Sequence, residues 1–285
     1  TQYRCLTVHA QPPVSQGVIL VEMLNILEGF DLTRWGFADP RTLHAMVEAK
    51  KAAFADRLAL LGDPEFVPDR TSILSSKDLA RSRSGHIAIQ TQPIPPGRDT
   101  TYFCIADGDG NAVSFIQSIY HAFGSGCIAS GTGILFNNRM TGFSLDRDSP
   151  NCLAPGKRPI HTLNTYIVTD GDRLRYVGGT PGGDVQVQTN CQVITSLVDF
   201  GMNVQQAVEA PRWQHVHDPS KASMILQLEG RFPRRLGDDL SAMGHPIRWI
   251  GDWSHSSSCQ LIRVDPSGAY MAASDPRCDG HAAGF

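Results

Sequence analysis

The chain has 285 residues, 41% of them hydrophobic, which is enough to bury a large core as one big domain or two small ones. Charged residues make up 19% and the formal net charge is -3, which favours neither a nucleic-acid-binding surface nor a disordered acidic tail. The apolar runs are short and interrupted by polar residues, so the sequence predicts no membrane-spanning segment.

The first part of the chain, residues 12–62, is predicted to be helical. The apolar run from Val18 to Leu27 indicates a largely apolar helix that ends near Gly29. The pair Asp39–Pro40 is typical of a helix start. Apolar residues then recur at near-helical spacing up to Gly62, which predicts a second long helix.

The pattern changes around residue 99. From Thr71 to Arg98 we expect order to fade, and the proline-rich segment 93–97 to form a stiff linker. The runs 101–106 and 112–119 are typical of strands, and the turn residues 107–111 between them predict a hairpin.

The C-terminal part alternates hairpins and helices. Strands are predicted at 165–169 and 174–178, followed by helices at 190–201 and 233–244 and a last hairpin over 259–273. Helices that flank paired antiparallel strands predict an α+β layered sandwich.

The seven cysteines are odd in number, widely spaced and without a Cys-x-x-Cys pair. A disulfide scaffold or a zinc site is therefore disfavoured. We expect mostly reduced, buried thiols, which leans toward a cytoplasmic rather than a periplasmic or secreted location.

Two other patterns could hold a metal ion. The turn Asp107–Asn111 resembles the start of a calcium loop, but Ser118 stands where that loop needs Glu, so a β-turn is favoured. His215 and His217 could also bind a metal, although two surface histidines after a helix are the favoured interpretation. The sequence therefore predicts no metal centre.

The junction Asp99–Thr100 is a candidate for catalysis. If the chain is cut there, Thr100 gains an α-amino group with a pKa of about 8, which can act as a general base near neutral pH. Downstream, the small residues Gly182 and Gly183 could let backbone N–H groups approach a developing oxyanion. The alternative is that Thr100 merely begins a strand and the glycines merely turn the chain.

Motifs in a fixed order and spacing cover nearly the whole chain. Upstream of the junction they are Leu24-Asn-Ile-Leu-Glu28, Glu48-Ala49, Ala55-Asp-Arg57 and Gly62-Asp-Pro64. From the junction onward they are Thr100–Ser114, Phe123-Gly-Ser-Gly126, Gly133–Asn138, Pro155-Gly-Lys-Arg-Pro159, Thr180-Pro-Gly-Gly183 and Asp275-Pro-Arg277. Together they resemble the end of the large subunit and the start and body of the small subunit of γ-glutamyltransferases.

This resemblance implies a four-layer αββα sandwich of the N-terminal-nucleophile hydrolase type. It also implies self-cleavage between Asp99 and Thr100. Residues 1–99 would be the C-terminal part of the large subunit, and residues 100–285 the small, catalytic subunit, tightly associated with it. Family members are about twice this long, and the N-terminal half of the large subunit is absent from this sequence.

The same resemblance implies roles for individual residues. Thr100 would attack a carbonyl to form an acyl-enzyme, while Gly182 and Gly183 hold the oxyanion. Ser118 stands where the family places a Thr whose hydroxyl supports the nucleophile, and a Ser hydroxyl can do the same. Nucleophile, base and oxyanion donors all come from the chain, so no cofactor is required.

The residues that recognise a γ-glutamyl group do not match. Tyr120 replaces a carboxylate-binding Asn, Arg139 and Gly142 replace a Gln and an Asp that hold the α-amino group, and His161-Thr162 replaces a Ser-Ser pair. An ammonium group prefers a nearby carboxylate, whereas Arg suits a carboxylate ligand. We therefore hypothesise a small-molecule amide whose acyl group carries a carboxylate or another strong acceptor and no α-amine. A dicarboxylic monoamide or the acyl side chain of a β-lactam-type substrate would fit.

Each pocket residue also has a structural interpretation. Arg139 could pair with Asp146 or Asp148, His161 could be a hydrogen-bonded loop residue, and Tyr120 could pack in the pocket wall.

The leading hypothesis is a self-processing amidohydrolase or acylase. One alternative is a true γ-glutamyl hydrolase or transpeptidase, such as a glutathione hydrolase, that recognises glutamate through other residues. Another is a non-catalytic, unprocessed relative acting as a binding module. The family's frequent export opposes the location suggested by the cysteines, so the compartment stays open.

Overall fold

The computed structural model describes residues 1–84, 99–218, 220–221 and 223–285. Its centre is a six-stranded sheet with the order β1-β2-β5-β6-β10-β11, in which all neighbouring strands are antiparallel. The strands are β1 (Gln2–Tyr3), β2 (Leu6–Ala10), β5 (Thr165–Asp170), β6 (Arg173–Gly179), β10 (Gln260–Val264) and β11 (Tyr270–Ser274). The sheet thus joins strands from both ends of the chain.

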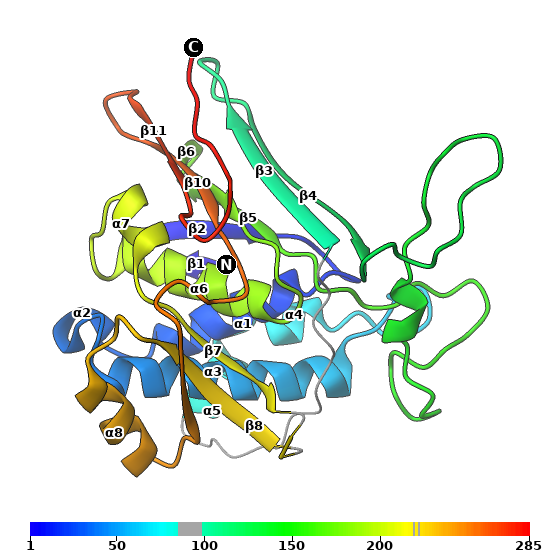
Figure 1. The fold of residues 1–285 in the computed structure, drawn as a ribbon, viewed down its shortest axis with the longest axis horizontal. Coiled ribbons are helices and arrows are strands. Elements are labelled where there is room, and N and C mark those ends of the chain that lie inside the picture. The colour runs from blue at the N-terminus through cyan, green and yellow to red at the C-terminus, as the bar shows by residue number, and fades with distance from the viewer. Residues whose placement is uncertain (85–98, 219, 222) are drawn as a thin grey trace.

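Helices cover one face of this sheet (Figure 1). The main ones are α1 (Gly17–Leu27), α3 (Pro40–Leu60) and α6 (Val185–Val198). Every residue of α1 is buried, because this helix contacts α3 and α6 as well as β2. Shorter helices complete the layer, namely α2 (Leu32–Trp35), α4 (Thr71–Leu74), α5 (Lys77–Ser84) and α7 (Val204–Glu209).

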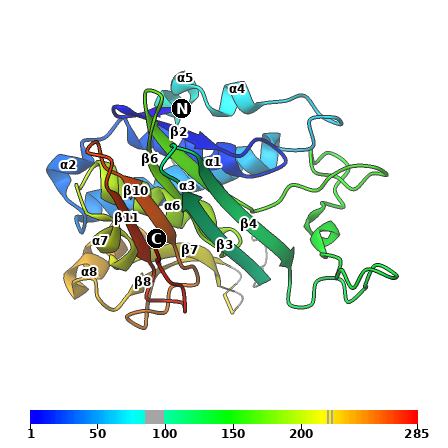
Figure 2. The same ribbon diagram turned by 90° about the horizontal axis from the view of Figure 1, so that it is seen from above.

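A two-stranded hairpin covers the opposite face of the sheet (Figures 1 and 2). It consists of β3 (Asp99–Ala106) and β4 (Ala112–Tyr120), which contact β5, β6 and β10. The absence of a side chain at Gly179 makes this packing possible, because a Cβ there would lie 2.4 Å from the ring of Tyr102. The hairpin is the second β layer of the sandwich.

The outer face of the hairpin is apolar and exposed. Phe103 and Phe115 stack on it with ring centroids 4.9 Å apart. No helix in the described part of the chain covers this face. The described residues therefore form three layers of the four-layer fold, namely the helices, the six-stranded sheet and the hairpin.

A small third sheet lies beside the helical layer. It contains β7 (Trp213–Asp218), β8 (Ser223–Glu229) and β9 (Ile247–Ile250), with α8 (Arg234–Ala242) between the last two. Buried Arg277 ties the C-terminal segment to this sheet through Glu229 and also binds Asp275.

The predicted helices and hairpins are present, with two differences. Residues 71–84 form α4 and α5 where order was expected to fade, because Ala80 is buried and Arg83 pairs with Asp56 of α3. The predicted linker 93–97 lies outside the described residues. Helix α6 begins at Val185 rather than at residue 190, since the carbonyls of Gly182 and Gly183 already accept hydrogen bonds from its first turn.

All seven cysteines have free thiols, but only Cys191 and Cys259 are buried. The expectation of mostly buried thiols is therefore wrong. Cys5 and Cys127 are exposed, and the other three are partly exposed. No helix that the structure describes is long and apolar enough to span a bilayer.

Candidate active site

The Asp99–Thr100 junction lies at the start of the hairpin. In the β3–β4 register Thr100 faces Ser118, and the Thr100 Oγ1 hydroxyl donates a hydrogen bond to Ser118 Oγ over 2.9 Å. Ser118 Oγ also accepts from the N–H of Tyr120 at 3.0 Å. Regular pairing is interrupted between Asp99 and Thr100, and Asp99 Oδ2 accepts a hydrogen bond from the N–H of Phe123. The Thr100 hydroxyl is thus held in a fixed direction.

The two glycines form the turn between β6 and α6. Their φ values are 130° for Gly182 and 58° for Gly183, in the region that favours glycine. A Cβ on Gly182 would also lie 2.8 Å from the Cβ of Ser257. Neither glycine N–H donates a hydrogen bond to any residue that the structure describes. Two backbone donors therefore remain available for an external acceptor.

Hairpin packing brings the β3 strand to the glycine turn. Thr100 and Tyr102 lie on the same face of β3, because side chains alternate along a strand. Tyr102 packs against Gly179, three residues before Gly182.

One pocket gathers all the residues predicted to recognise the acyl group. Its lining includes Tyr120, Arg139, His161 and Thr162, together with Gly142. The other lining residues are Gln16, Arg57, Leu61 and Ile160. The structure thus brings together residues from the end of β4, the short 3-10 helix at 139–142 and the segment before β5.

Gln16 connects this pocket to the glycine turn. Its Nε2 donates to the carbonyl of Thr162 at 2.7 Å and to the carbonyl of Gly183 at 3.3 Å. On the other side, the backbone of Tyr120 contacts Ser118, the partner of Thr100. The pocket is therefore connected to the glycine turn through Gln16, and to the predicted nucleophile through Tyr120 and Ser118.

Arg139 is a partly buried cation that forms no ion pair with the described residues. Its guanidinium lies over the Tyr120 ring, 5.3 Å from the centroid, and its Nη2 is buried without a hydrogen-bond partner in the described part of the chain. Burial lowers the pKa of Arg139, although Tyr120 acts in the opposite direction. No carboxylate of the described residues pairs with it, so the alternative of an ion pair with Asp146 or Asp148 is wrong.

One ring nitrogen of His161 is available to a ligand. The His161 backbone bonds to Val14 and Gln16, but Nδ1 is buried and has no hydrogen-bond partner among the residues that the structure describes. Burial, and next the nearby charge of Arg139, lower the pKa of His161 to about 4. A ring that is neutral near pH 7 can donate one hydrogen bond to a ligand.

The lowered pKa of His161 predicts a pH-dependent stability. Between its ordinary pKa of 6.5 and about 4, the unfolded chain binds more protons than the folded one, so stability falls as pH falls. We expect His161→Gln to lose less stability than the wild type between pH 7 and pH 5, measured as urea midpoints. The exposed His9→Gln variant is the control. If the urea midpoint of His161→Gln falls from pH 7 to pH 5 by as much as that of the wild type, the burial of this ring is contradicted.

Sequence reasoning missed Arg57 as a pocket residue. Its side chain is 2% exposed on α3, and Nη1 donates to Gln16 Oε1 and to Asp184 Oδ1, each at 2.7 Å. Its Nε and Nη2 are buried and have no hydrogen-bond partner within residues 1–84, 99–218, 220–221 and 223–285. In the sequence Arg57 is only part of the motif Ala55-Asp-Arg57. No local signal separates it from Lys50, which is also a buried cation of α3 beside Phe54.

The two sequence patterns considered for metal binding form a turn and part of a strand. Asp107 Oδ1 accepts hydrogen bonds from the N–H groups of Asp109 and Asn111, as expected for a turn. His215 is buried in β7 with Nδ1 3.5 Å from Lys50 Nζ, so its interpretation as a surface residue after a helix is wrong.

The fold is that of the N-terminal-nucleophile hydrolases. It superposes on the crystal structure of a cephalosporin acylase from Bacillus halodurans with a TM-score of 0.89 and 35% identity, covering 100% of this chain and 52% of that one. The chain belongs to the γ-glutamyltranspeptidase family, whose sequence model matches residues 1–285.

Two curated relatives illustrate the range within this family. The "glutathione hydrolase-like YwrD proenzyme" of Bacillus subtilis is 40% identical over 289 residues, which is 100% of this chain and 55% of that protein. The "oxamate amidohydrolase proenzyme" of Klebsiella pneumoniae is 36% identical over 278 residues, 96% of this chain and 52% of that protein. The chain thus spans about half the length of the curated relatives it matches.

Proposed function

We propose that this chain carries the nucleophile and part of the acyl pocket of a self-processing amide hydrolase. Its substrate would be an amide whose acyl group bears a carboxylate and no α-amine. The observation that supports the substrate class most strongly is the pair of guanidinium groups, Arg57 and Arg139. Both line one pocket with buried N–H groups that no described residue binds.

In the proposed maturation, the peptide bond between Asp99 and Thr100 is hydrolysed. Residues 1–99 then form the end of a large subunit and residues 100–285 a small subunit, and the two remain associated. Strands from both parts of the chain support this association, because β2 pairs with β5 in the central sheet.

In the proposed reaction, the new α-amino group takes the proton of the Thr100 hydroxyl as Oγ1 attacks the amide carbon. The N–H groups of Gly182 and Gly183 hold the oxyanion, and Ser118 keeps the hydroxyl oriented. The proton passes to the leaving amine as the C–N bond breaks, leaving an acyl ester on Thr100. Water, deprotonated by the same amino group, then hydrolyses this ester and restores the enzyme.

The charge of the pocket supports an anionic acyl group. Asp184 is held by Arg57 and is not among the lining residues, which include no carboxylate. A bound α-ammonium group would therefore meet two guanidinium groups, and the neighbouring carboxylate of Asp184 already pairs with Arg57. A carboxylate could instead accept charge-assisted hydrogen bonds from both guanidinium groups. The neutral His161 ring could add a further donor.

The names of the relatives are consistent with this proposal. Oxamate is a dicarboxylic monoamide, and one relative is named for its hydrolysis. The structural neighbour is named for acting on cephalosporins, which are β-lactam compounds.

A panel of amides tests the proposed substrate class. We expect the purified protein to hydrolyse dicarboxylic monoamides, and to prefer them over matched γ-glutamyl amides by at least about 10-fold in kcat/KM, since the unfavourable ammonium contact costs roughly 1.4 kcal/mol or more. Amides with an uncharged acyl group of the same length are the control for size. Preference for the γ-glutamyl amides would favour a true γ-glutamyl hydrolase, and an uncut chain without turnover would favour a binding module.

A further inference from the structure

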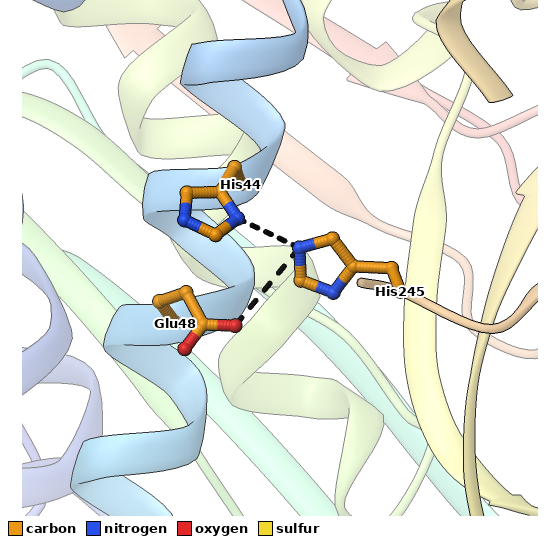
Figure 3. A group of neighbouring side chains, drawn as sticks. All are labelled: His44, Glu48 and His245. Carbon is orange, nitrogen blue, oxygen red and sulfur yellow. Dashed lines mark hydrogen bonds and ion pairs between the residues drawn. The ribbon is translucent and has the colours of Figure 1, made fainter. Parts of the chain in front are cut away.

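A group of three potential metal ligands lies away from the acyl pocket, where α3 meets the loop before β9. His44 and Glu48 come from α3, and His245 follows α8 (Figure 3). One ligand atom from each residue lies within 4.8 Å of the other two. None of the three lines the acyl pocket.

The helix itself orients two of these side chains. Residues four apart lie on the same face of an α-helix, so His44 and Glu48 are stacked one turn apart. His245 approaches from the other segment, and its backbone N–H is fixed by the carbonyl of Leu240. Glu48 and His245 are buried, whereas His44 is partly exposed. Solvent can therefore reach the group from the His44 side.

The distances are close to those of a four-coordinate zinc site. His44 Nδ1 lies 2.8 Å from His245 Nε2, and His245 Nε2 lies 3.9 Å from Glu48 Oε1. Two ligand atoms on a tetrahedral zinc ion are about 3.3 Å apart, given Zn–N bonds of about 2.0 Å. Shifts of about half an ångström, well within side-chain freedom, would bring both of these distances to that spacing, and the third pair of ligand atoms, on His44 and Glu48, lies within 4.8 Å.

The ligand set also matches zinc chemically. Two imidazoles and one carboxylate are a common zinc set that leaves a fourth position for water. Glu48 is now neutralised by Lys51, whose ammonium forms an ion pair with Oε1. Lys51 is 23% exposed in its side chain, so it can turn to solvent when a divalent cation takes its place.

From this geometry we propose that His44, Glu48 and His245 form a binding site for a divalent transition metal of the zinc class. The bound ion would replace the hydrogen bond between the two imidazoles with bonds to the metal. It would tie α3 to the segment between α8 and β9, and so join the helical layer to the small third sheet. Stabilisation follows because the ion binds the folded chain better than the unfolded one.

Binding of Zn²⁺ and Co²⁺ to the purified, EDTA-treated protein tests this site. We expect about one Zn²⁺ per chain after gel filtration and a higher melting temperature in Zn²⁺ than in EDTA. Co²⁺ should give the visible bands of a tetrahedral nitrogen and oxygen site without a thiolate band. A thiolate band would mean that the ion binds an exposed cysteine, such as Cys5 or Cys127, instead of the proposed site.

Variants locate the ion. His44→Ala removes a partly exposed side chain and should leave the circular dichroism spectrum unchanged while weakening Zn²⁺ binding by at least about 10-fold, as even indirect partners of a metal contribute that much. Glu48→Gln should also weaken binding, whereas His281→Ala, at an exposed position, should not. The proposal is overturned if Zn²⁺ and Co²⁺ fail to bind, if His44→Ala binds as tightly as the wild type, or if the Co²⁺ spectrum is that of thiolate ligands.

Discussion

Replacement of Thr100 by alanine is expected to leave a single uncut chain and to lower amide turnover by about 10⁴-fold or more. The variant lacks the hydroxyl that we propose as the nucleophile for both self-cleavage and catalysis. Its fold should persist, because the lost hydrogen bond to Ser118 is only partly buried. Gel electrophoresis and the hydrolysis rate of the best amide measure the two effects.

Thr101→Ala is the matched control for this experiment. Thr101 is the next residue of β3, but its side chain is exposed on the outer face of the hairpin. We expect this variant to be cut and to turn over substrate at the wild-type rate. If the turnover rate of Thr100→Ala stays within about 10-fold of the wild-type rate, Thr100 is only a minor contributor and the nucleophile is another residue.

Replacement of Arg139 by glutamine should lower kcat/KM for a dicarboxylic monoamide by about 10- to 100-fold, the loss expected for a hydrogen bond to a charged group. The rate for an amide with an uncharged acyl group of the same length should change little. This contrast follows because Arg139 Nη2 lacks a partner among the described residues and Arg139 lines the pocket. Steady-state kinetics on the two substrates measures it.

Arg147→Gln provides the control for removing a positive charge, since Arg147 is exposed and lies outside the pocket lining. It should leave both rates unchanged. If Arg139→Gln slows the charged and the uncharged substrate equally, Arg139 does not recognise a carboxylate.

Features that depend on residues close together in the chain could be predicted from the sequence. The Asp39–Pro40 start predicted α3, and Asp39 does accept a hydrogen bond from the N–H of Arg41. The turn residues 107–111 predicted the hairpin that pairs Thr100 with Ser118. In both cases residues close in sequence determine the structure.

Tertiary contacts account for what was missed. Arg57 belongs to the pocket because Gln16 and Asp184, far away in sequence, bind its guanidinium. His215 is buried because β7 packs against α6 and its ring lies beside Lys50 of α3, which no local pattern indicated. Spacing along the chain says little about such contacts, since they depend on how separate elements pack.

The masses and N-termini of the purified protein test the central claim most directly. We expect incubation at neutral pH to yield two associated fragments, one of which begins at Thr100. A chain that stays whole, or a cut that leaves another residue at the new N-terminus, would contradict it, because Thr100 would then lack the α-amino group that is proposed as its base.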